Sequence, residues 1–272
     1  MIAEFYTPDF PLCQFIEHFF YYRDYSPLHD IDRLLPEGDV QLIFDLTDRP
    51  KPIFDNHSLK EIQSCRKAWF SGFRTIPITI PSGKEDEMLI VQFRKGKAHA
   101  FLKTPMHALL NSVVDAEQVL QTTILQIWET LMEMPTPALK FHALEQELLQ
   151  NYAAHLHENP FVDFAVAKIL AFPNQSSIRA IADKAGYSQK HIIKLFKEQV
   201  GVTPKTFLKV IRFQKAIQQI EQKQTIDWSA VTYDCGFYDQ SHFIADFKAF
   251  SGLTPTEYLY QRGEFLNYVP IK

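Results

Sequence analysis

Several features that would mark a secreted, membrane-spanning or disulfide-stabilised protein are missing from this sequence. Its 272 residues include three cysteines, Cys13, Cys65 and Cys235, which are too few and too scattered for a disulfide framework. No apolar run is long enough for a transmembrane helix, and the acidic start MIAEFYTPDF, broken by proline, does not resemble a signal peptide. We therefore expect a cytoplasmic protein that does not contact a membrane.

Enzymatic signatures are missing as well. There is no Gly-x-Ser-x-Gly, phosphate-loop or dinucleotide fingerprint. A metal site needs several histidines and a carboxylate that converge on one cavity. His57, His99 and His107 are scattered instead, and no His-x-His pair occurs. We expect no catalytic residues, no metal and no cofactor.

The charge balance excludes a protein that is basic over its whole surface, because the net charge is −4 at pH 7. The charges are divided unevenly. Residues 161–272 hold 14 Lys and Arg against 10 Asp and Glu, whereas residues 1–160 hold 14 against 22. The composition, 46% hydrophobic and 22% charged, is globular, and the length suits about two domains. A mildly basic half beside an acidic half favours DNA contact by the C-terminal part alone.

The most informative feature that is present is an internal repeat. IADKAGYSQKHIIKLFKEQVGVTP (181–204) and VTYDCGFYDQSHFIADFKAFSGLTP (231–255) share a Gly-aromatic pair, a Phe-Lys pair and a final Thr-Pro. The offset between the copies is 50 residues before the second helix of each and 51 after it, so one residue is inserted in the turn. Each copy reads as a short helix, a glycine turn and an amphipathic helix. This is the pattern of a helix-turn-helix, which places one helix in the DNA major groove.

Local signals place each helix of the first copy. Ser177 can cap a first helix that Gly186 ends, and Ser188 can cap the second. In that second helix an apolar stripe through Ile192 and Phe196 should face the core. The residues on and beside its opposite face are the ones we expect to contact DNA: Gln189, Lys190, Ile193, Lys194 and Lys197.

The second copy repeats the scheme with a different outer face. Asp227 and Asp239 can cap its helices and Gly236 ends the first, while Asp246 lies at the edge of the inner stripe. Lysines can pair with guanine edges or phosphates, whereas Ile and Ala can meet only thymine methyls. We therefore expect the first copy to supply more of the affinity. The DNA-contacting residues predicted here are Gln240, Ser241, His242, Ile244 and Lys248.

A long helix should join the two copies. There is no glycine or proline from Lys205 to Gln224, and apolar residues from Phe207 to Ile220 keep helical spacing. A helix of about 18 residues would be roughly 27 Å long. Such a rod could hold two reading helices about one DNA turn, ~34 Å, apart. Arg212 on this rod is expected to brace the two units or touch phosphate.

Residues 160–262 resemble the AraC/XylS family of bacterial transcription regulators. The run CGFYDQSHFIADFKAFSGLTPTEYL (235–259) carries the resemblance, and IRFQKAI (211–217) supports it. The resemblance implies a DNA-binding domain, here 160–265, whose two recognition helices enter adjacent major grooves of a promoter. It also implies a tendency toward activation and makes RNA polymerase a candidate partner. Where family members often carry Arg on the second recognition helix, this chain has Ala245.

The N-terminal half, 1–157, reads as β-rich. Residues 40–47 alternate between apolar and other side chains, and 31–35, 66–72, 75–80 and 87–94 are further strand candidates. Short strands at this spacing suggest a small barrel or sandwich. LPEGDVQLIFDL (35–46) and VQFRKGKAHAFL (91–102) resemble the cupin-like sensing domain of some regulators in the family, which implies a small-molecule effector of unknown identity. The many phenylalanines could line a pocket, although most should form the core.

Two amphipathic helices should follow, at 115–133 and 138–157. They could simply cover the barrel, but in related regulators the equivalent helices form a dimer interface, so we expect a possible homodimer. The segment around Glu158-Asn159-Pro160 is the predicted link between the domains, and Pro173 to Ser176 a loop before the first helix-turn-helix. The expected fold is thus multidomain: a β-rich cupin-like barrel with following helices, then an all-α domain of seven helices with two helix-turn-helix units.

Three other functions remain open from the residues. The chain could be a cupin-type metal-dependent enzyme fused to a helical module. It could be a DNA-repair alkyl acceptor that uses Cys65, whose basic neighbours in Gln-Ser-Cys-Arg-Lys could lower the pKa of the thiol. It could also be an interaction adaptor whose repeat never meets DNA. We favour the DNA-binding regulator, because two units with matching caps and turns are joined by a rod.

Overall fold

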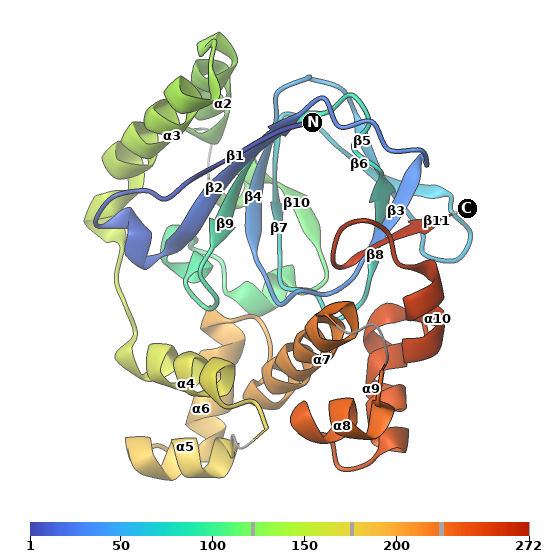
Figure 1. Ribbon diagram of the computed structural model, residues 1–272. Helices are drawn as coiled ribbons and strands as arrows, with labels where there is room; N and C mark the ends of the chain where they lie inside the picture. The colour runs from blue at the N-terminus through green and yellow to red at the C-terminus, as the bar shows by residue number, and fades with distance from the viewer. Residues whose placement is uncertain (121–122, 175–176, 223–225, 272) are drawn as a thin grey trace.

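The computed structural model of the protein describes residues 1–120, 123–174, 177–222 and 226–271. They form a β-rich N-terminal half that packs on a helical C-terminal half, as the blue and red ends of the chain in Figure 1 show. The predicted fold class, a β-rich part followed by an all-α part, is confirmed.

Two antiparallel sheets face each other in the N-terminal half. The order of the first is β1 (Ile2–Tyr6), β2 (Ile16–Arg23), β9 (Glu87–Phe93), β4 (Gln41–Asp45), β7 (Ala68–Ser71) and β10 (Val113–Asp115). The order of the second is β11 (Tyr268–Ile271), β3 (Ile31–Leu34), β8 (Ile78–Pro81), β5 (Lys51–Phe54) and β6 (Glu61–Cys65).

All five strand candidates are confirmed as β3, β4, β7, β8 and β9. Strand β4 shows why its residues alternate, since successive side chains point to opposite faces of a sheet. Leu42 and Phe44 are buried under the helices of this half, whereas Gln41 and Ile43 face a cavity between the two sheets. The second face of the strand is therefore an internal wall and not an outer surface.

Strand β11 was not predicted and comes from the far end of the sequence. It follows the last helix and pairs with β3 in an antiparallel register that runs from Tyr268 opposite Leu34 to Ile271 opposite Ile31. The chain therefore returns from the helical half to complete the edge of the N-terminal sheet, beside the label C in Figure 1.

Helices cover the other face of the six-stranded sheet. The predicted helix over 115–133 consists of α1 (Ala116–Leu120) and α2 (Thr123–Glu133), and residues 121–122 lie outside the described part. The second is α3 (Pro137–Tyr152) followed by the 3₁₀ turn η4 (Ala153–His155). Trp128 of α2 donates from Nε1 to the Asp45 carbonyl at 2.7 Å, so these helices are packed onto the sheet.

Seven helices form the C-terminal half within the described residues, as predicted. Asn159, in the segment predicted to link the halves, caps the first helix, and Pro160 opens it. The predicted loop Pro173–Ser176 is only partly described. The helices are α4 (Pro160–Ala171), α5 (Ile178–Ala185), α6 (Gln189–Gln199), α7 (Pro204–Gln222), α8 (Trp228–Asp234), α9 (Gln240–Ser251) and α10 (Pro255–Gln261).

The two halves share apolar contacts. Phe73, which follows β7, packs against Phe207 of α7 with ring centroids 6.0 Å apart. The backbone of Gly38 lies against Val210 of the same helix, where a Cβ would be 3.3 Å from the valine. The long helix thus runs directly beneath the barrel (Figure 1).

A polar group of three residues, Glu37, Gln214 and Asn267, joins the halves, and we call it the interdomain cluster. Gln214 of α7 donates from Nε2 to Asn267 Oδ1 at 2.9 Å and to the Pro36 carbonyl at 2.7 Å. Asn267 donates from Nδ2 to Glu37 Oε1 at 2.9 Å. Burial, together with the nearby Asp39 carboxylate, raises the pKa of Glu37 to about 7.

Candidate nucleic-acid interface and ligand cavity

The turns of both helix-turn-helix units have the predicted geometry. Ser177 and Ser188 cap α5 and α6, accepting from backbone N–H groups two or three residues into each helix. Asp227 and Asp239 do the same for α8 and α9. Gly186 ends α5 with φ +70°, a left-handed conformation that costs glycine little. Each second helix is therefore fixed at its start relative to the first.

The predicted contact face of the first unit is open to solvent. Ile192 and Phe196 on the inner side of α6 are fully buried. Lys194 is 3.8 Å from Glu198 one turn away, in an exposed pair that leaves the ammonium accessible. The five residues predicted to contact DNA are all exposed: Gln189, Lys190, Ile193, Lys194 and Lys197.

The same helix touches the barrel at its C-terminal end. The Lys197 carbonyl is 3.3 Å from Nδ1 of His107, in the turn η3 (Met106–Leu109). Gly201 lies against the Met106 carbonyl, where a Cβ would be 3.3 Å away. The β-rich half therefore contacts the C-terminal end of α6 and leaves the predicted DNA-contacting face of the first unit uncovered.

The second unit uses its acidic residue internally. Asp246 of α9 is 9% exposed, and Lys209 of α7 donates from Nζ to its Oδ1 at 2.8 Å. His242 Nε2 is 3.2 Å from the other carboxylate oxygen. The Asp246 carboxylate therefore faces helix α7. Apart from the half-buried His242, the residues predicted to contact DNA here are exposed: Gln240, Ser241, Ile244 and Lys248.

The inserted residue of the second turn is Tyr238. Phe237, which aligns with Tyr187 of the first copy, is buried against Phe243 with ring centroids 5.2 Å apart, whereas Tyr187 is 45% exposed. Tyr238 follows it and is 92% exposed, directly before the cap of α9. The change of offset is visible in the sequence, but it does not predict a role for Tyr238.

Arg212 of α7 braces the two units. It donates from Nε to the Pro173 carbonyl at 2.9 Å, in the segment that leads to the first unit. The same nitrogen lies 3.3 Å from where a Cβ on Gly236 would be, in the turn of the second. Helix α7 has 19 residues, so it is about 28 Å long at ~1.5 Å per residue.

Two family models match the chain. A helix-turn-helix domain matches residues 181–261, and a domain of unknown function, DUF6597, matches residues 4–115. An uncharacterized HTH-type transcriptional regulator of Haemophilus influenzae is 25% identical over 156 residues, 57% of this chain and 52% of that protein. The HTH-type transcriptional activator RhaS of Escherichia coli O157:H7 is 27% identical over 95 residues, 35% of this chain and 34% of RhaS. The chain thus spans about half or less of the length of each of these relatives.

The matched C-terminal domain is of the AraC type, and the relatives are transcriptional regulators. A solved structure of ToxT from Vibrio cholerae is 12% identical, with a TM-score of 0.48, over 89% of this chain and 98% of ToxT.

The β-rich half contains a cavity of about 490 Å³ between its two sheets, which is partly open to solvent. Its volume lies in the range of small-molecule pockets, roughly 300–1,000 Å³. His18 and His29 both line it. Aromatic and aliphatic side chains supply most of its wall, among them Phe20, Tyr22, Trp69, Ile80 and Ile90.

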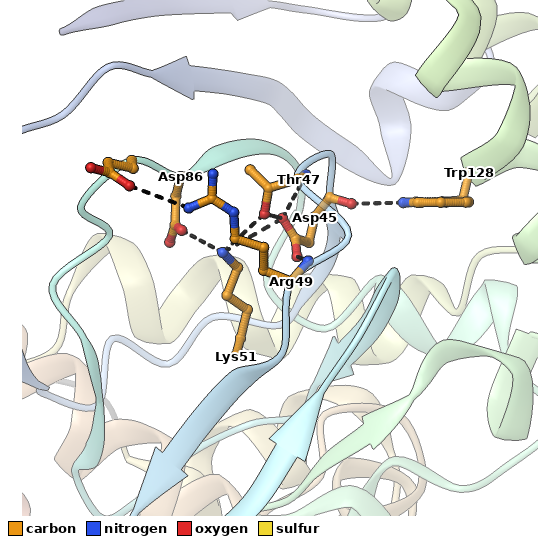
Figure 2. A network of polar contacts seen from close by, with 7 residues as sticks. Asp45, Thr47, Arg49, Lys51, Asp86 and Trp128 are labelled. Carbon is orange, nitrogen blue, oxygen red and sulfur yellow. Dashed lines mark hydrogen bonds and ion pairs between the residues drawn. The ribbon is translucent and has the colours of Figure 1, made fainter.

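A polar network closes one side of the cavity, and Figure 2 shows it around Lys51. The Lys51 ammonium pairs with the cavity-lining Asp86 and lies 3.7 Å from Oδ1 of the buried Asp45. It also donates to Thr47 Oγ1 at 3.1 Å. Because Trp128 bonds to the carbonyl of the same Asp45, the network connects the cavity wall to helix α2.

Other polar groups face the cavity without charge. Gln41 donates to Gln92 Oε1 at 2.8 Å. The Ser82 side chain also lines the cavity, but the buried hydroxyl oxygen has almost no accessible surface and, among the described residues, no hydrogen-bond partner.

The thiol of Cys65 also lines the cavity. It is 1% exposed, and burial, with a smaller effect from Asp115, raises its pKa to about 12. The basic neighbours therefore do not activate it, because the thiolate is the reactive form.

Among the described residues, no three or more His, Cys, Asp or Glu side chains gather where they could hold a metal ion. His57, His99 and His107, considered above, lie on separate loops and turns. The described helices include none with the length and apolar character needed to cross a membrane.

Proposed function

We propose that this chain is a sequence-specific transcription regulator that binds double-stranded promoter DNA. Helices α6 and α9 would enter adjacent major grooves, with α7 setting the distance between them. The observation that carries the proposal is the pair of capped helix-turn-helix units. Their predicted contact residues, apart from the half-buried His242, stay exposed while an apolar stripe on the inner side of each second helix is buried. The first unit, with three exposed lysines, would supply more of the affinity.

We also propose that the cavity between the sheets holds an effector. It is concave, largely apolar and carries a few polar groups, as small-molecule sites do. A homodimer through α2 and α3, contact with RNA polymerase and a cytoplasmic site of action belong to the same proposal. The exposed Met132 and Leu139 on these helices are the apolar residues a dimer would cover.

The test is selection of DNA from a random library by the full-length chain, followed by salt titration of binding to the selected site. We expect a preference over random DNA and an affinity that falls steeply with salt. Lys194→Ala should reduce the salt slope by about 1, whereas Lys60→Ala, an exposed lysine of the barrel, should not change it. A lack of preference for any sequence, with and without added extracts of small molecules, would contradict the proposal.

A further inference from the structure

One wall of the cavity comes from the part of the chain that follows the second helix-turn-helix. We call residues 263–271 the tail segment. Phe265, Leu266, Tyr268 and Pro270 of this segment line the cavity together with the strands of the barrel. A site that looks like part of the N-terminal domain is therefore built from both ends of the chain.

The tail segment is held over the cavity by backbone and ring contacts. Leu35 donates from its backbone N–H to the Asn267 carbonyl at 2.9 Å, in line with the β3–β11 pairing. The ring of Phe265 meets Tyr25 edge-on, with centroids 5.5 Å apart. Asn267, at the centre of the segment, is part of the interdomain cluster.

The start of the tail segment is fixed to the second DNA-binding unit. Helix α10 directly precedes it, and its Tyr258 is buried against Phe247 of α9 with ring centroids 5.7 Å apart. Arg262, at the end of α10, pairs with Glu221 of α7. Movement of the tail segment away from the barrel would therefore loosen the second unit from the barrel as well.

The interior of the cavity suits a molecule without charge. Its buried carboxylates already have partners: Asp32 is 2.9 Å from His29 Nε2, and Asp86 pairs with Lys51. An anion would be placed near these carboxylates, and any ion would lose its hydration in an apolar space. The uncharged amide groups of Gln41 and Gln92, which also line the cavity, can hydrogen-bond a neutral polar group.

We propose that the cavity binds an uncharged, mainly apolar small molecule with at least one hydrogen-bonding group, and that the tail segment forms its closing wall. Ligand binding and the docking of the second DNA-binding unit on the barrel are then linked, because a ligand that contacts the tail segment stabilises the docked arrangement. This inference rests on the proposed regulator function and names the ligand class and coupling of that site.

Two dyes that share one ring system test the ligand class on the full-length chain. N-phenyl-1-naphthylamine is uncharged, and 8-anilinonaphthalene-1-sulfonate adds a sulfonate to the same rings. We expect saturable fluorescence enhancement with one neutral dye per chain and about tenfold or more weaker binding of the anion. Equal binding of the two dyes, or no saturable binding of the neutral one, would overturn the proposed ligand class.

Two pairs of variants locate the dye. Ile43→Trp fills the cavity from β4 and should abolish binding, whereas Ile62→Trp, on the exposed side of β6, should leave it unchanged. Tyr268→Ala removes the wall contributed by β11 and should weaken binding by about tenfold, while Tyr260→Ala, an exposed tyrosine of α10, should have no effect. Tyr268→Phe keeps the aromatic ring and should retain dye binding. This control shows that weaker binding by Tyr268→Ala comes from the missing ring and not from misfolding.

Hydrogen exchange of residues 263–271 tests the coupling directly. The neutral dye should slow exchange of these amides in the native chain and not in Ile43→Trp. Dye binding that leaves this exchange unchanged would disprove the coupling. This outcome is independent of DNA, so it is distinguishable from failure of the proposed regulator function, which would show as absence of DNA binding.

Discussion

The two helix-turn-helix units have the same frame and differ in how they are held and in what they present. The first rests on the barrel through the Lys197 carbonyl and exposes three lysines on α6. The second is tied to α7 through Asp246 and continues into the tail segment, and its outer face has one lysine. Caps and turn glycines are shared by both copies, because they specify the backbone. The residues on the outer faces and those that anchor each unit can differ between the two copies. One unit can therefore supply most of the DNA affinity while the docking of the other depends on the β-rich half.

The largest expected effect is on DNA affinity. Replacing Lys190, Lys194 and Lys197 with alanine removes three charges from α6, and we expect affinity to fall by about 100-fold or more at moderate salt. Lys248→Ala in α9 removes one charge and should cost less than about tenfold. Titration of a selected DNA site with each variant measures both. Similar losses of DNA affinity in the two variants would contradict the proposal that the first unit supplies more of the affinity.

The turn glycines should differ in their effect on stability. Gly186→Ala places a Cβ in open space at φ +70° and should cost about 1 kcal/mol from backbone strain alone. In Gly236→Ala, at φ +79°, the new atom would be 2.5 Å from Cα of Asn174, and the clash should raise the cost to about 3 kcal/mol. Urea unfolding of both variants measures the difference. Equal costs would show that the second turn is not packed against the segment before the first unit.

The partly buried ion pair Lys209–Asp246 of the second unit should contribute more to the free energy of unfolding than the exposed pair Lys194–Glu198 of the first. Asp246→Ala leaves Lys209 without its partner and should lower the free energy of unfolding by about 2 kcal/mol, a value reduced because the lysine side chain is about a third exposed. Glu198→Ala breaks the exposed pair with Lys194 and should change it by less than about 0.5 kcal/mol. An Asp246→Ala variant as stable as the native chain would contradict this anchoring.

The smallest effect concerns pH. The pKa of Glu37 is raised to about 7 in the docked structure, above the ordinary value of 4.5. Its contribution to stability is therefore complete below about pH 4.5 and is lost as the pH rises through about 7, by at most about 1.4 kcal/mol between pH 6 and 8. The second unit should thus dock less tightly at pH 8, which proteolysis of the tail segment would detect. The Glu37→Gln variant should show the same cleavage rate at both pH values.

The helical half could be predicted almost completely from the sequence because its signals are local. Each cap, such as Ser188 or Asp239, acts within three residues, and the stripe through Ile192 and Phe196 is visible in a single turn or two. The insertion in the second turn was also visible. That it would expose Tyr238 was not, because the choice between Phe237 and Tyr238 for the buried position depends on packing against α9.

The β-rich half was predicted less fully because strand pairing is not local. Strand β11 became a strand only through its partner β3, more than 200 residues earlier in the chain. Strand β2 was not foreseen because both of its faces are covered: Phe19 and Tyr21 lie in the main core, whereas His18, Phe20 and Tyr22 face the cavity. No periodicity in the sequence could show that two histidines among aromatics line an internal space.

The most direct test of this account is hydroxyl-radical footprinting of the full-length chain on its selected DNA site. We predict two protected patches on one face of the DNA, about 10 base pairs apart, with the patch of the first unit persisting to higher salt. Lys194→Ala should weaken both patches together, because the rigid α7 makes binding by the two units cooperative. A single protected patch would contradict the claim that both units read DNA.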